Sequence, residues 1–91
     1  MLVTLEEMKT YLRVDFDDDD SILSAFIESA QKLCIDVARI EDEDAFADVA
    51  NGRIAVMYAA AYLYEHREKA DHHELIMTLR ALLFGSRKEV F

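Results

Sequence analysis

The residues best suited to chemistry gather in an acidic run near the N-terminus. The stretch from Val14 to Ile22, VDFDDDDSI, holds five aspartates in six consecutive positions, Asp15 to Asp20. Carboxylates at this density can bind a divalent cation or form an acidic surface. They can also begin a helix, because they accept hydrogen bonds from free N–H groups and complement the helix dipole. These alternatives separate an ion-binding protein from a structural one.

A calcium loop of the EF-hand type needs ligands at its first, third, fifth and twelfth positions and glycine at its sixth. Counted from Asp17, the ligand positions are Asp17, Asp19, Ser21 and Glu28, but the sixth position is Ile22. The segment from Ser21 onward also has the apolar spacing of a helix, and a helix cannot wrap around an ion as a loop does. We therefore favour a solvated helix start, keep a functional acidic surface as the second interpretation, and expect no metal.

The histidines and the single cysteine do not form a catalytic pattern. His72 and His73 are adjacent, so on a helix their side chains point about 100° apart, and neither they nor His66 belong to a metal-binding motif. Cys34 falls on an apolar helix face, where a small buried thiol is the ordinary expectation. No serine lies in a nucleophile motif, and no glycine-rich phosphate loop exists. We expect no catalytic residue, no cofactor and no enzymatic activity.

Tyrosines near the middle of the chain could stack bases in a single-strand binder, but such sites also need a basic groove. The chain carries a net charge of −9, and residues 15–48 hold twelve Asp and Glu against Lys32 and Arg39. This charge argues against specific nucleic-acid binding. We interpret Tyr58, Tyr62 and Tyr64 as core and interface aromatics.

The elements that position these residues are predicted to be helices. Ninety-one residues make a single domain (1–91), and the absence of proline with only two glycines indicates an all-α fold of about four helices. Thr4 and Glu7 have the spacing of a capping box, and Val3 and Met8 that of a hydrophobic staple, so a first helix is predicted to about Arg13.

A second helix follows the acidic run. Its apolar residues recur with the helical period, and Ile35 falls on its polar side. The periodic residues are Ile22, Leu23, Phe26, Ile27, Ala30, Leu33, Cys34 and Val37.

The third helix is predicted to begin between Asp44 and Asn51 and to run to about Glu68. Its centre, Ile54 to Tyr64, is eleven apolar residues, too few to cross a bilayer. Such a helix must be covered on every side, and three other short helices can hardly cover it. Neighbouring copies of the chain could cover it, which predicts an oligomer. The residues expected at the interface between copies are Ile35, Met57, Tyr58, Tyr62 and Tyr64.

A fourth helix is predicted from a second capping box, with Asp71 as the cap and Glu74 at its third position. Leu75, Ile76, Leu79, Leu82 and Leu83 form its apolar stripe. Gly85 is the expected stop, and residues 86–91 are expected to be a tail.

Three parts of the chain together form a family pattern: Leu5 to Leu23, Ala60 to Glu68, and the phrase Ala81-Leu82-Leu83. They resemble the head–tail connector, or DNA-packaging, proteins of tailed bacteriophages. In that family an opening helix ends in a YLR-hydrophobic-D phrase, here Tyr11 to Asp15. A later apolar helix closes with Y-E-x-R-E, here Tyr64 to Glu68. These phrases occur in the order and at the spacing found in the family, and together they extend over nearly the whole chain.

The resemblance implies a virion protein of a phage or prophage, made in the cytoplasm of the bacterial host and placed at the head–tail junction. It implies a homo-oligomeric ring below the portal that contacts the portal and the downstream head-closure or tail proteins, and that lets DNA pass without specific binding. No membrane role is implied. Carboxylates expected at the channel or its rim are Asp17, Asp18, Asp19, Asp20, Glu41, Asp42, Glu43 and Asp44. The alternative function is a small acidic helical regulator, or DNA mimic, that binds a basic protein.

Overall fold

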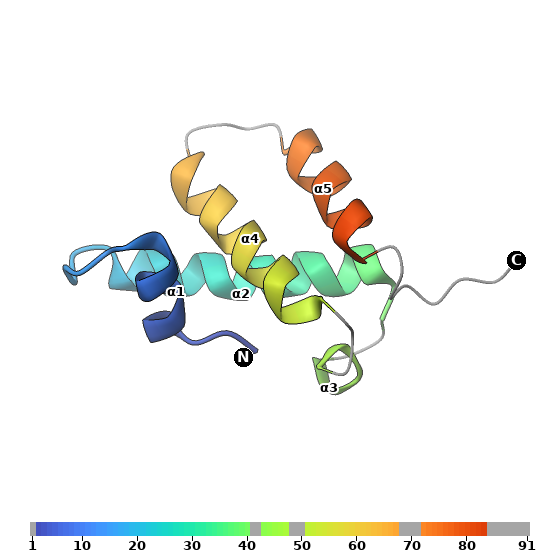
Figure 1. Cartoon of the computed structure of the whole chain (residues 1–91), viewed down its shortest axis with the longest axis horizontal. Coiled ribbons are helices and arrows are strands. Elements are labelled where there is room, and N and C mark those ends of the chain that lie inside the picture. Colours follow the sequence, from blue (N-terminus) through green and yellow to red (C-terminus); the bar gives the residue numbers. More distant parts are fainter. Residues whose placement is uncertain (1, 41–42, 48–50, 68–71, 84–91) are drawn as a thin grey trace, which may run out of the picture.

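The computed structural model describes residues 2–40, 43–47, 51–67 and 72–83, and these residues form helices and connecting turns without a strand (Figure 1). The helices are α1 (Leu5–Leu12), α2 (Asp20–Ala38), α3 (Glu43–Phe46), α4 (Gly52–Glu65) and α5 (His73–Leu83). The all-α class and the four predicted helices are confirmed. The single turn of α3 was not predicted.

Helix α2 is the longest element, and the other main helices lie across one side of it (Figure 1). Helix α4 crosses α2 and makes the most extensive contact of any helix pair. Helix α1 lies beside the N-terminal half of α2 and α5 beside its C-terminal half. The centre of the molecule is therefore the crossing of α2 and α4.

Helix α1 begins as its sequence predicts. The Thr4 hydroxyl accepts a hydrogen bond from the Glu7 N–H at 3.1 Å, and the Thr4 N–H donates to the Glu7 carboxylate at 3.0 Å. Val3 and Met8 are both fully buried, as a hydrophobic staple requires. The helix ends at Arg13, whose left-handed backbone (φ 60°) turns the chain toward the acidic run.

Helix α2 begins inside the acidic run, but not by the expected capping. Asp19 is the N-cap residue, and its side chain accepts no hydrogen bond from the helix N–H groups. That expectation is wrong for Asp19, because its carboxylate is bonded instead to a tyrosine of α4. Asp20, the first helical residue, still complements the helix dipole.

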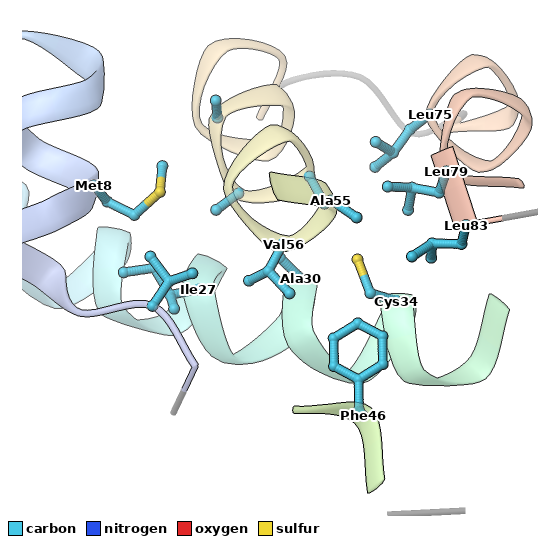
Figure 2. Packing of buried hydrophobic residues seen from close by; sticks show 14 of the residues in the cluster. Met8, Ile27, Ala30, Cys34, Phe46, Ala55, Val56, Leu75, Leu79 and Leu83 are labelled. Atoms are coloured by element: carbon cyan, nitrogen blue, oxygen red, sulfur yellow. The ribbon is translucent and has the colours of Figure 1, made fainter. Parts of the chain in front are cut away.

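The buried stripe of α2 is narrower than predicted. Leu23, Ile27, Ala30 and Cys34 are fully buried, whereas Phe26, Leu33 and Val37 are half-buried and Ile22 is exposed. Small residues occupy the point where α4 crosses, since Ala30 and Cys34 of α2 lie close to Ala55 and Val56 of α4 (Figure 2). Small side chains allow two helices to approach closely.

Helix α4 begins at Gly52, after Asn51, whose left-handed backbone (φ 64°) forms the turn before it. A Cβ atom added to Gly52 would lie 3.3 Å from the ring of Phe46, so this glycine lets α3 approach the start of α4. Phe46 is fully buried and lies close to Cys34 (Figure 2). The buried ring of Phe46 thus anchors the one-turn helix α3 to the core.

Helix α5 completes the core with Leu75, Leu79 and Leu83, all fully buried. These three side chains point toward the crossing of α2 and α4 (Figure 2). The predicted cap Asp71, the predicted stop Gly85 and the tail 86–91 lie outside the described residues.

Candidate functional site

The apolar centre of α4 is covered by its own chain on most sides but not on all. Ala55, Val56, Ala59 and Ala60 are fully buried among the other helices. Ile54 on the opposite side is 57% exposed. Helices α1, α2 and α5 therefore leave one strip of α4 that is exposed at Ile54 and half-buried at Met57, Tyr58 and Tyr62.

This strip continues onto α1 and forms one surface. Ile54, Met57, Tyr58 and Tyr62 recur along α4 at helical spacing, and Tyr11 of α1, 52% exposed, lies against the same surface. We call these five residues the α1–α4 face. Exposed apolar groups collected on one face usually mark a contact with another macromolecule.

Two shallow hollows flank the face and meet at Tyr11. One lies between α1 and the start of α4, lined by Glu6, Glu7, Thr10, Tyr11, Arg53 and Met57. The other runs between the end of α1, α4 and the start of α5, and is lined by Tyr11, Leu12, Tyr58, Ala61, Tyr62, Glu65, His66 and Glu74. Arg53 forms an ion pair with Glu7, which joins α4 to α1 beneath the first hollow.

The structure brings together three of the five residues predicted at an oligomer interface. Met57, Tyr58 and Tyr62 share the α1–α4 face, whereas Ile35 lies on a different helix, α2. All four side chains are half-buried against the core. Tyr64 lies in an internal contact with the acidic run. Tyr11 was missed because it stands on the polar side of a short helix, and only the position of α4 beside α1 makes it part of a surface.

The acidic run is held to α1 by one nearly buried cation. Lys9 Nζ lies 2.7 Å from Asp17 Oδ1 and 2.9 Å from Asp20 Oδ1, and its side chain is only 11% exposed. The hydrogen bonds to Asp17 and Asp20 raise the pKa of Lys9, and the bond from Lys9 lowers the pKa of Asp17. Lys9 and Asp17 therefore stay charged near neutral pH, and the contacts of Lys9 fix the loop between α1 and α2.

A second contact joins the run to the end of α4. The Tyr64 hydroxyl donates to Asp19 Oδ2 at 2.6 Å, and this bond raises the pKa of Tyr64. Arg67 Nη1 lies 3.9 Å from the same carboxylate oxygen, and the guanidinium lies over the Tyr64 ring, 5.0 Å from its centre. Asp19 therefore stabilises the packing of α4 against the loop.

For the remaining acidic residues predicted at a channel or its rim, no contact to the other helices is described. Asp18, like Asp15, is exposed and has no ion pair within the described ranges. Glu43 and Asp44 lie in α3, which packs near the C-terminal half of α2, whereas the Asp run lies at the N-terminal end of α2 (Figure 1). The side chains of both residues, and Glu41 and Asp42 altogether, lie outside the described parts. The Asp run and α3 thus lie at different ends of the molecule.

The histidines pack beside the α1–α4 face. The His66 ring stacks on Tyr62 with 4.3 Å between ring centres, and its Nδ1 lies 3.1 Å from the Tyr62 carbonyl oxygen. His72 contacts the edge of the same Tyr62 ring. In the described part of the chain, no three His, Cys, Asp or Glu side chains are placed to hold a metal ion.

Cys34 is fully buried between α2 and α4, and burial raises the pKa of its thiol to about 12. Ser21 and Glu28, the two further residues of the calcium-loop pattern, both lie within α2. Among the residues that the structure describes, the geometry therefore offers surfaces for association with another macromolecule.

Comparison with known proteins gives one match. The family model described as phage gp6-like head–tail connector protein matches residues 2–88. No curated protein and no solved structure matches the chain. Among the described helices, none has the length and apolar content needed to cross a membrane.

Proposed function

The chain belongs to the phage gp6-like head–tail connector family, and from this premise we propose that it forms a homo-oligomeric ring below the portal. The ring extends the channel through which DNA passes and joins the head to the tail. Its partners are further copies of itself, the portal protein and the downstream head-closure or tail proteins. Its role is structural and its place is the head–tail junction of the virion.

The observation that carries this proposal is the family match over residues 2–88, since it spans every described helix. The α1–α4 face supports the self-assembly part. A ring subunit must present apolar surface that its own fold does not cover, and Ile54 and Tyr11 are both more than half exposed.

The charge of the chain supports passage of DNA without binding. A net charge of −9 repels phosphates, and described cations such as Lys9 and Arg67 are already paired with aspartates. A channel wall of this charge does not retain the DNA that moves along it.

The test is deletion of the gene from the phage or prophage genome that encodes it. We expect heads that fail to join tails, and restoration of infectious particles when the protein is supplied from a plasmid. Cryo-electron microscopy of parental particles should show the ring between portal and tail. Tailed, infectious particles without the protein would contradict the proposal, and a monomeric chain that binds one basic protein would favour the acidic regulator instead.

A further inference from the structure

A second uncovered surface lies between the C-terminal half of α2 and α5. Its apolar lining is Leu33, Val37 and Ile76, and its charged groups are Asp36, Arg39 and Arg80. We call these six residues the α2–α5 groove. Like the two hollows that flank the α1–α4 face, the groove combines apolar and charged groups, but here the two arginines outnumber the one aspartate.

This excess is unusual in so acidic a chain. Among the described residues, Lys9, Arg53 and Arg67 are engaged in ion pairs. The described cations without an ion pair are Arg13, Lys32, Arg39 and Arg80. Two of these four line the groove.

The residues that border the α1–α4 face have the opposite charge to the arginines of the groove. Glu6 borders its first hollow, and Glu65 and Glu74 border its second, while the one guanidinium there, Arg53, is paired with Glu7. If two α1–α4 faces met each other, these carboxylates would lie against their own copies. If the face met the groove, they would lie near Arg39 and Arg80.

The two surfaces also lie toward different ends of α2. Helix α1 is beside its N-terminal half, and α5 is beside its C-terminal half (Figure 1). A contact between two different surfaces of one chain leaves the second surface of each copy free for the next copy. Such head-to-tail contacts produce rings when the rotation between copies closes.

We propose that the α1–α4 face of one copy docks against the α2–α5 groove of the next copy. The inference rests on the proposed ring function and specifies its subunit contact. The side chains of Tyr11, Ile54 and Met57 cover Leu33, Val37 and Ile76 of the neighbour, and the glutamates that border the face oppose the arginines of the groove.

The test uses two variants that each block one surface of the full chain. Tyr11→Glu/Ile54→Glu blocks the face, and Arg39→Glu/Arg80→Glu blocks the groove. All four positions are exposed, so both variants should fold, as circular dichroism and thermal melting would show. Should a melt show unfolding, Tyr11→Ser/Ile54→Ser and Arg39→Ser/Arg80→Ser replace them. Ala25→Glu/Ser29→Glu, on the exposed side of α2, is the matched control.

Native mass spectrometry then separates the possible contacts. We expect the parent and the control to form oligomers, and each blocked variant alone to be monomeric. An equimolar mixture of the two blocked variants should form a heterodimer and nothing larger, because one intact face and one intact groove remain between them.

Three results would overturn the inference. A groove-blocked variant that still dimerises by itself indicates a face-to-face contact. A mixture that stays monomeric shows that face and groove do not meet, and a parent that is monomeric at the highest soluble concentration shows that neither surface binds a copy. The deletion experiment is independent of all three, so loss of tail joining would still support the connector role.

Discussion

At the scale of residues, the acidic run is a set of contacts rather than a uniform patch of charge. Lys9 binds Asp17 and Asp20, and Tyr64 binds Asp19, whereas Asp15 and Asp18 face solvent. Among these contacts, those of the nearly buried Lys9 should matter most for stability, because a buried charge without its partner is destabilising. Substitution of different aspartates within this one run should therefore change the stability of the protein by different amounts.

Asp17→Asn/Asp20→Asn should lower the melting temperature at neutral pH more than Asp15→Asn/Asp18→Asn, which removes the same charge. The lowered pKa of Asp17 also fixes the sign of its pH dependence. Its stabilising effect is complete above the ordinary pKa of 3.8 and is lost as pH falls through the lower folded value.

The measurement is thermal melting from neutral pH down to about pH 3. The parent and Asp15→Asn/Asp18→Asn should lose stability in acid along similar curves, and Asp17→Asn/Asp20→Asn should show a shallower loss. Identical curves for the two double variants would mean that the Lys9 contacts do not stabilise the fold.

Cys34 should be unreactive in the folded protein. Its pKa of about 12 leaves almost no thiolate near neutral pH, and thiolate is the reactive form. We expect Ellman's reagent to label the chain only after denaturant is added, at a rate that follows unfolding. Rapid labelling of the native protein would indicate that the α2–α4 crossing opens readily.

At the scale of elements, the α2–α4 crossing holds the molecule together. Ile27→Ala should lower the free energy of unfolding by about 2–5 kcal/mol, because it removes fully buried methyl and methylene groups from a packed core. Ile22→Ala is the matched control five residues earlier on the same helix, at an exposed position, and should cost much less. Chemical denaturation of both variants provides the comparison, and equal losses would mean that α2 presents a different side to the core.

At the scale of the whole molecule, the net charge of −9 should keep DNA from binding. Replacing Asp17, Asp18, Asp19 and Asp20 together would also break the contacts to Lys9 and Tyr64, so that change mixes charge with stability. Asp15→Asn/Asp18→Asn alters charge alone and leaves a net charge of −7 (−9 + 2), so the assembled oligomers of the parent and of this variant should both fail to bind duplex DNA. Salt-sensitive binding of duplex DNA by the parent oligomer would contradict the proposal that the channel does not retain DNA.

The sequence by itself determined the four main helices, both ends of α1 and the start of α2 in the acidic run. The capping box at Thr4 and Glu7 and the periodic stripe from Leu23 to Cys34 act between residues a few positions apart, so their effect is readable without a fold. The family phrases rest on the same local features, and the family match agrees with them. The sequence did not determine the first residue of α4, because Asn51 and Gly52 are only weak indicators of a helix start.

Only the tertiary structure decided which surfaces are covered. Asp19 and Tyr64 are 45 positions apart, and their hydrogen bond overrides the local preference of an aspartate to cap its own helix. Likewise, the sequence of an apolar helix such as α4 does not show which of its sides faces solvent. Its open side, with Ile54 exposed and Ala59 buried, exists because α1 and α5 pack beside it, and such long-range packing leaves no trace in hydrophobic periodicity.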